Sequence, residues 1–450
     1  MSSIQYIIQT GLFCQDPDYL VWLPEDPLDD STAWVVTSQK SHTDFLCPHC
    51  GEPMHVYGTY RTRLRTVPMQ PNARRTVLFE GHRFRCPCCQ ETVTELNPYR
   101  CPGTRITKRA AVWIKSLLAQ GLTIAGVQKI TGIHWDTIRR VQETVMEETL
   151  EAYAAMHKKQ QYKPRFLAVD EFAIHKGHTY ATTVMDLESG FVLWVGKGRS
   201  IADFQKFFEE VPQEQLSDVQ AVAMDMNASY NTLIRRYLPQ ADIVYDRYHM
   251  QAQYGRDVLG VVRLEEARKH KTAADKLKQE RSAASDSETA KTLRRQEAVE
   301  RSKYRQLKQA RWTLLTNQEN LKPSRKDSLE TIISEHEAVA ICYAMKEEMI
   351  KLYAITDYEK AVEGWKRWFK AAKESEIPAL IRFAKLKEKR IDGLANHAKC
   401  PINTGRLEGY NNKIKVAKRN AYGYKNDRYF FTLIRYLSLP TYDLESPKNT

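Results

Sequence analysis

Three acidic residues, Asp170, Asp225 and Glu408, stand where this sequence most clearly predicts chemistry. The segment "RFLAVDEFAI" is an apolar, strand-like run that closes on Asp170, and "VQAVAMDMNASY" repeats this pattern at Asp225. In "NTGRLEGYNNKIK", Glu408 opens a basic segment with a helical pattern. Carboxylates at two strand ends and on one helix would share an edge of a sheet, where their hard oxygens suit Mg²⁺. Two such ions about 4 Å apart can cut and rejoin phosphodiesters.

A sheet must position these carboxylates, and residues 163–250 have the pattern of one. A helix capped by Ser200 or Asp203 should follow the third strand, and a second helix should span 229–238. Asp170 is preferred to Glu171 as a ligand because neighbours on a strand face opposite sides. The order β-β-β-α-β-α-β predicts a mixed sheet with helices packed on it, which is the order of the ribonuclease-H-like fold. The predicted strands are 166–170, 178–186, 191–198, 219–224 and 241–245.

Length and charge limit the class of protein. The chain has 450 residues, which predicts two to four domains. Its net charge of +13 favours a polyanionic partner, and nucleic acid is the commonest. No signal peptide or long uninterrupted apolar segment is evident, so we expect a cytoplasmic protein with no membrane contact. Its cysteines are then unsuited to a disulfide framework.

Two cysteine pairs predict a structural zinc site. Cys47 and Cys50 lie in "CPHC", and Cys86 and Cys89 lie in "CPCC". Each pair offers two thiolates one tight turn apart, and two pairs complete a tetrahedral Zn²⁺ site. A β-hairpin formed by "TYRTRLRTVPM" and "RTVLFEGHRFRC" would bring them together. The exact ligands stay open, because other side chains could replace a member of the quartet: Cys88, His49, His55 and His82.

The segment "TKRAAVWIKSLLAQGLTIAGVQKITGIHWDTIRRVQETV" predicts three short helices separated by Gly121 and Gly132. This is the layout of a helix-turn-helix, in which the last helix enters the DNA major groove. We expect Thr137, Arg139 and Arg140 of that helix to face outward and contact DNA. The alternative is a three-helix core without a DNA-binding role.

The acidic and cysteine motifs lie in a chain that resembles the transposases of the ISL3 family of bacterial insertion sequences (the IS204, IS1001, IS1096 and IS1165 group). The resemblance covers nearly the whole length. It rests on "VDEFAIHKGHTYATTVMDLESG", "VAMDMNASY", "DRYHM", "RWTLLTNQENL", "YAMKEEMIKLY" and above all "NTGRLEGYNNKIKVAKRNAYGY". The extra thiol in "CPCC" is a small departure.

The family resemblance implies a DDE transposase whose catalytic acids are Asp170, Asp225 and Glu408. The implied cofactors are two catalytic Mg²⁺ ions, for which Mn²⁺ can substitute, and one structural Zn²⁺. The implied partners are the terminal inverted repeats and target DNA, bound by a homodimer, with strand cleavage followed by strand transfer. His249, in "DRYHM", would lie near the scissile phosphate or in the wall of the active site; the alternative is that Asp246 caps a helix and His249 is packed structurally. A domesticated, non-catalytic DNA-binding regulator is the alternative function.

The resemblance also implies an α/β multidomain fold with a ribonuclease-H-like core that an all-α insertion interrupts. Basic residues near the acids are expected to contact DNA phosphates, the alternative being a solvated basic face: Lys176, Lys413, Lys415, Lys418 and Arg419. The predicted domains are a zinc-binding β module (1–100), a helix-turn-helix (101–155), the first part of the core (160–255), the helical insertion (256–400) and the last part of the core (401–450).

Overall fold

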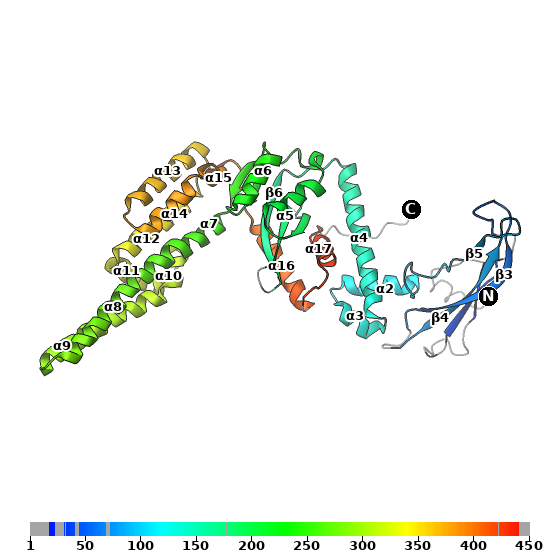
Figure 1. Ribbon diagram of the computed structural model, residues 1–450, viewed down its shortest axis with the longest axis horizontal. Helices are drawn as coiled ribbons and strands as arrows, with labels where there is room; N and C mark the ends of the chain where they lie inside the picture. Colours follow the sequence, from blue (N-terminus) through cyan, green and yellow to red (C-terminus); the bar gives the residue numbers. More distant parts are fainter. Residues whose placement is uncertain are drawn as a thin grey trace. The chain divides into compact units, whose positions relative to one another are not determined.

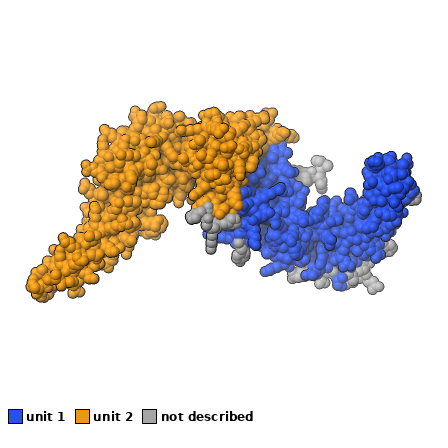
Figure 2. Space-filling view, in the orientation of Figure 1, with its two compact units in different colours: residues 1–156, 417–436 blue, residues 157–416, 437–450 orange. Residues whose placement is uncertain are grey.

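The computed structural model describes residues 18–22, 31, 33–40, 45–68, 73–175, 179–421 and 423–440 (Figure 1). The chain forms two compact units (Figure 2). The first unit consists of residues 1–156 with 417–436, and the second of residues 157–416 with 437–450. None of the helices in the described ranges combines the length and the apolar character that crossing a bilayer requires.

The first unit begins with a five-stranded sheet. The strand order is β1-β2-β4-β3, and β5 pairs with β4. Strands β2 and β4 are parallel, and the other pairs are antiparallel. Alternate residues of β2 and β4, such as Val36 and Phe79, are buried because successive side chains of a strand face opposite sides. The strands are β1 (Tyr19–Trp22), β2 (Ala33–Ser38), β3 (His55–Arg65), β4 (Thr76–Arg85) and β5 (Thr92–Thr94).

Three helices follow the sheet in the first unit, at the positions the glycine spacing predicts: α2 (Lys108–Ala119), α3 (Ile124–Thr131) and α4 (Trp135–Lys159). The hydroxyls of Thr107 and Thr123 cap α2 and α3, and Gly132 ends α3 with a positive φ of 65°. Helix α17 (Asp427–Leu437) contacts α4, where the Tyr429 hydroxyl donates a hydrogen bond to Gln142 at 2.5 Å.

The second unit contains the predicted mixed sheet. Its strand order is β10-β9-β6-β7-β8. Strands β6, β9 and β10 are parallel to one another, whereas β7 and β8 are antiparallel additions. Helix α5 (Ile201–Glu210) and helix α6 (Ala228–Tyr237) interrupt the strands as the sequence predicts. The strands are β6 (Phe166–His175), β7 (Thr179–Asp186), β8 (Val192–Lys197), β9 (Ala221–Met224) and β10 (Asp242–Tyr245).

Strand β6 is longer than predicted, and the prediction that it closes on Asp170 is wrong. It continues to His175, because Phe172 and Ile174 keep the buried alternation and the extension pairs with β7. Asp170 therefore lies within the strand, opposite Thr183. The extension also fixes Glu171 on the face opposite to Asp170.

A long helical segment separates β10 from helix α16 (Gly405–Asn420), as the sequence predicts (Figure 1). Helices α8 and α9 run side by side as a hairpin, and the aromatic rings of α13 and α14 form part of the core around Trp365 and Phe383. The helices of this segment are α7 (Arg247–Tyr254), a π-helical turn (Gly255–Leu259), α8 (Gly260–Ala283), α9 (Ser287–Gln309), α10 (Arg311–Leu315), α11 (Pro323–Glu335), α12 (Glu337–Leu352), α13 (Tyr358–Glu374), α14 (Pro378–Glu388) and α15 (Ile391–Ala395).

Candidate functional site

Helix α16 lies beside the strand that carries Asp170. The Asn411 side-chain amide donates a hydrogen bond to Asp170 Oδ2 at 2.7 Å, and Asn411 is buried. Glu408 lies three residues before Asn411 on this helix, so the two share one side of it. Glu408 is exposed to solvent. Burial raises the pKa of Asp170 above its usual value, which makes its ionised form costly unless a cation is bound.

His249 lies between the two predicted catalytic aspartates. Its Nε2 is 4.0 Å from Asp170 Oδ1, and its Nδ1 is 3.9 Å from Asp225 Oδ2. Asp225 directly follows β9, which pairs in parallel with β6, so neighbouring strands present both carboxylates. The structure therefore brings these three residues together, and Glu408 lies about one helical turn from Asn411, the residue that contacts Asp170.

Asp246 connects the elements that carry His249 and Glu408. Its Oδ1 accepts hydrogen bonds from the backbone N–H groups of Tyr248 (2.8 Å) and His249 (3.1 Å), which caps α7. Its Oδ2 accepts one from the backbone N–H of Thr404 at 2.9 Å, just before α16. Asp246 is buried, with an exposed fraction of 4%. One carboxylate thus fixes two helix starts. The capping of α7 confirms the alternative that the sequence offered for Asp246, whereas nothing in "DRYHM" indicates the contact with Thr404.

We expect Asp246→Asn to loosen the start of α16 selectively. The amide oxygen can still cap α7, but the amide NH₂ would face the N–H of Thr404, so two donors would meet. Loss of such a supporting contact typically costs about 10–100-fold in metal affinity or activity. A Mg²⁺ titration of DNA nicking would measure it. Asp357→Asn, which changes an equivalent cap on α13, should leave the Mg²⁺ titration unchanged. Equal effects of the two variants would contradict the role of Asp246 in positioning α16.

Glu171 is held on the other face of β6. Its Oε1 accepts hydrogen bonds from Asn227 (3.2 Å) and from the hydroxyl of Tyr230 (2.9 Å), and its Oε2 lies 3.6 Å from Arg199. These contacts join the strand to α6. The preference for Asp170 over Glu171 as a ligand agrees with this geometry.

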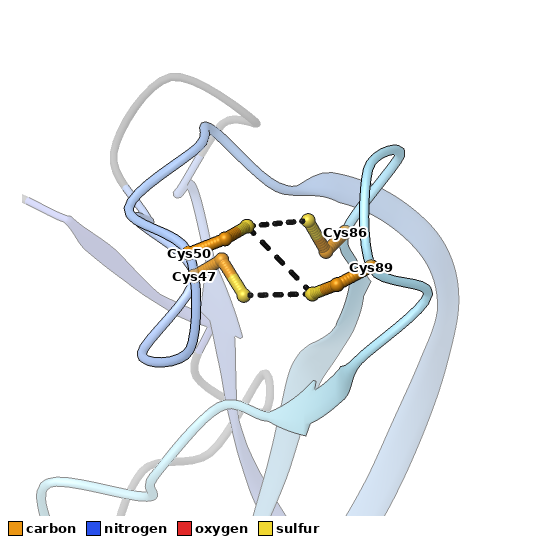
Figure 3. Close-up of side chains that lie close together, drawn as sticks. All are labelled: Cys47, Cys50, Cys86 and Cys89. Atoms are coloured by element: carbon orange, nitrogen blue, oxygen red, sulfur yellow. Dashed lines mark hydrogen bonds between the residues drawn. The ribbon is translucent and has the colours of Figure 1, made fainter.

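Four cysteines form a compact group at the open end of the β3–β4 hairpin, where β3 begins and β4 ends (Figure 3). The Sγ–Sγ distances are 3.5 Å for Cys47–Cys89, 3.4 Å for Cys50–Cys86 and 3.7 Å for Cys50–Cys89. A tetrahedral zinc ion with Zn–S bonds of about 2.3 Å separates its sulfurs by about 3.8 Å, so the group fits the ion. Cys88, which the sequence left as an alternative, is exposed and lies outside this group.

Hydrogen bonds within the cysteine group shift the pKa values of its thiols in opposite directions. The backbone N–H of Cys89, aided by the Cys50 side chain, lowers the pKa of Cys86 to about 7. The backbone N–H of Glu52 lowers the pKa of Cys50, but the Cys86 side chain and burial outweigh it and raise this pKa to about 12. A thiolate is the form that binds a metal. Within the described part of the chain, this quartet is the group of metal-ligating side chains whose donor atoms all lie within 4.8 Å of one another.

The predicted DNA-contacting residues of α4 differ in exposure. The prediction that Arg139 faces outward is wrong, because its guanidinium pairs with Glu143 at 2.8 Å and stacks over the Tyr429 ring at 4.9 Å. Helix α17 supplies that ring, and nothing in the local pattern of α4 indicates it. Thr137 is half-buried, and Arg140 is exposed and donates to the carbonyl of Gly103.

The basic residues of α16 are spread along the helix. Lys413 donates to the carbonyl of Leu437 at 2.9 Å, and Lys415 donates to Asn412 at 3.2 Å. Burial lowers the pKa of Lys418, whereas Arg419 is exposed. Lys176 lies outside the described residues.

Strand β3 presents arginines that the sequence analysis missed. Arg61, Arg63 and Arg65 alternate along it and so share one face. Burial and the charges of Arg74 and Arg63 lower the pKa of Arg65, which shows that like charges gather there. The period-two run "RTRLR" was the signal that could have identified this surface.

Comparisons with known proteins identify the family to which the chain belongs. The family model of the ISL3 transposases, described as "Transposase", matches residues 167–434, from β6 into α17. The chain is 32% identical over 414 residues to the transposase for insertion sequence element IS1001 of Bordetella parapertussis, which covers 92% of each chain. This chain belongs to the ISL3 transposase family.

Two transposases with lower identity are also similar over most of the chain. The transposases for insertion sequence element IS1557 from two strains of Mycobacterium tuberculosis are each 23% identical over 362 residues, covering 79% of this chain and 76% of theirs. The family match includes β6, β9, α7 and α16. The elements that carry Asp170, Asp225, His249 and Glu408 therefore all lie within the matched residues.

Proposed function

We propose that this ISL3-family protein is a DDE transposase that binds the terminal inverted repeats of its own insertion sequence and catalyses Mg²⁺-dependent strand cleavage and strand transfer. The contact between Asn411 and Asp170 carries this proposal. It places the helix of Glu408 beside the strand of Asp170 despite the long helical segment between them. The sheet order and the mixed strand directions support a ribonuclease-H-like core.

The donor set suits magnesium. Asp170, Asp225 and Glu408 offer oxygens only, and both the Asp225 and Glu408 side chains are open to solvent, so water and phosphate oxygens can complete the coordination. Asp170 would be shared between two ions, while Asp225 and Glu408 would each hold one. When bound, such ions lower the pKa of a coordinated water and stabilise the leaving oxygen.

The side chains around the carboxylates have positioning roles in this proposal. Asn411 orients the Asp170 carboxylate, and Asp246 sets the starts of α7 and α16. The ring nitrogens of His249 lie 4.0 Å from Asp170 Oδ1 and 3.9 Å from Asp225 Oδ2, so His249 would hydrogen-bond a water or a phosphate oxygen bound between them. Catalysis then depends on alignment and charge stabilisation, with little proton transfer by side chains.

The first unit would bind the DNA ends. The α2–α4 helices have the layout of a helix-turn-helix, with Arg140 exposed at the start of the third helix. The arginines of β3 would contact phosphates, and the zinc site would hold the hairpin that carries them. Phosphate contacts give register and salt-dependent affinity, whereas base contacts give sequence choice. Joining two ends calls for a homodimer in the DNA complex.

Glu408→Gln tests the proposal directly. The substitution keeps size and helix position but removes the negative charge, so we expect loss of Mg²⁺-dependent nicking by about 10²-fold or more, with unchanged affinity for DNA that carries the borders of the element. The matched control is Glu359→Gln, an exposed glutamate in the first turn of α13. A wild-type protein that binds these borders without nicking them in Mg²⁺ would favour a non-catalytic regulator instead.

A further inference from the structure

The helical segment contains a groove that the proposed cleavage reaction does not yet use. It has a volume of about 580 Å³ and lies between α7, the π-helical turn and α8 on one side and α10 on the other. Its lining is largely apolar, with Leu259, Leu264 and Leu315 among its residues. Three arginines complete it, and no acidic residue lines it within the described chain. The groove therefore suits a ligand that is flat and apolar in one part and anionic in another.

Two aromatic side chains at this groove are open to solvent. Tyr248 is 60% exposed and Trp312 is 62% exposed. The guanidinium of Arg311 lies 5.2 Å from the centre of the Trp312 ring. Exposed large rings next to an apolar hollow are a common sign of a binding surface. An aromatic face beside a guanidinium is an arrangement on which a nucleobase stacks while its phosphate is neutralised.

The three arginines of the groove have different neighbours. Arg263 is buried and donates hydrogen bonds to the carbonyls of Leu307 (2.8 Å) and Lys308 (3.0 Å), which fixes it structurally. Arg256 pairs with Asp257 at 2.7 Å, so much of its charge is balanced. Arg311 is exposed. The pKa of Arg263 is lowered mainly by burial and to a smaller extent by the positive charge of Arg311. Arg311 is thus the group best placed to attract an anion.

Helix α7 connects the groove to the carboxylates. Tyr248, which lines the groove, directly precedes His249 on this helix. His249 lies 4.0 Å from Asp170 Oδ1 and 3.9 Å from Asp225 Oδ2. The π-helical turn that begins at Gly255 sits at this junction, and such turns often mark functional sites.

We propose that this groove holds an unpaired nucleotide of the DNA strand next to the scissile phosphate. Trp312 and Tyr248 would stack on its base, and Arg311 would contact its phosphate. A hollow of this volume accommodates a single nucleotide, whereas a duplex is too broad to enter it. Stacking of this kind tolerates any base, so the groove would assist strand separation without reading sequence. This inference rests on the proposed DNA cleavage activity, and its first test does not require that activity.

Photo-crosslinking of the full chain locates the nucleotide without any cleavage step. The probe is a short single-stranded oligodeoxythymidylate containing 5-iodouracil, irradiated with the protein in metal-free buffer. We expect the crosslinked peptides to contain Trp312 or Tyr248, and Trp312→Ala to reduce the yield about tenfold to a hundredfold. Crosslinks confined to the first unit would overturn the inference.

Cleavage assays then test the purpose of the groove. Trp312→Ala should nick fully paired ends about tenfold to a hundredfold more slowly, and should recover on ends whose terminal nucleotides are already unpaired. Trp312→Phe should keep most activity on paired ends, and Val299→Ala, an exposed residue of α9, should behave as wild type. If Trp312→Ala nicked paired ends at the wild-type rate, the inference would be wrong. A wild-type protein that crosslinks at Trp312 yet nicks no substrate would count against the proposed cleavage activity only.

Discussion

Asp170→Asn should reduce Mg²⁺-dependent nicking by about 10³-fold or more while leaving the affinity for end DNA unchanged. Asp170 is the carboxylate that both ions would share, so its loss removes charge from each of them. Each factor of ten in rate corresponds to about 1.4 kcal/mol of transition-state stabilisation, and a shared metal ligand supplies several times that. The amide oxygen that the substitution introduces can still accept the hydrogen bond from Asn411, but the amide NH₂ would then face the backbone N–H of Glu171, from which Asp170 Oδ1 accepts at 2.8 Å. The folding of the variant therefore has to be measured together with its activity. Gel assays of nicking and of binding, run on the same DNA, measure both effects.

Thermal unfolding of wild type and Asp170→Asn, measured as a function of pH, shows whether the variant is folded and whether Asp170 has a raised pKa. Burial penalises the ionised carboxylate in the folded protein, so Asp170 contributes its full stability only in acid and loses it as the pH rises through its raised pKa. In metal-free buffer, the Tm of wild type relative to Asp170→Asn should therefore fall as the pH rises. Mg²⁺ should raise the Tm of wild type selectively at neutral pH. Nicking by a folded Asp170→Asn protein would refute the catalytic assignment.

Cys86→Ser should release zinc and unfold the open end of the β3–β4 hairpin, where β3 begins and β4 ends. Cys86 is fully buried in a small core with Cys47, Met54 and Phe84, and we expect this core to be too small to hold that end without a metal. Structural zinc sites contribute about 10–16 kcal/mol of apparent binding free energy, and that energy is coupled to folding. We expect zinc content measured by mass spectrometry to fall from stoichiometric to near zero, proteolysis to begin within residues 45–95, and binding of end DNA to be lost.

A neighbouring cysteine supplies the matched control for the zinc site. Cys88 is exposed and lies outside the quartet, so Cys88→Ser should retain zinc, protease resistance and DNA binding. Unchanged zinc stoichiometry in Cys86→Ser would contradict the ligand assignment. Zinc loss in both variants would show that Cys88 has a ligand role that the geometry does not assign.

Local patterns were sufficient to predict the three helices after the cysteine pairs and the strands and helices of residues 163–250, apart from the extension of β6 to His175. Alternating apolar residues mark strands, and glycines at positive φ, such as Gly132, end helices; both effects depend on a few neighbouring residues. The spacing of the cysteine pairs likewise reflects one tight turn each. These elements also predicted a mixed sheet, whereas its strand order, β10-β9-β6-β7-β8, is known only from the structure.

The sequence by itself determined which residues can do chemistry here, since residue type and local spacing set ligand chemistry and strand or helix formation. Only the tertiary structure decided which of these residues contact one another. Asn411 contacts Asp170 from 241 residues away, and Asp246 contacts Thr404 from 158 residues away. Arg139 turned inward because a ring from α17 packs on it. Such contacts depend on how distant elements pack together, and the periodicity of a segment encodes only which of its own faces is buried.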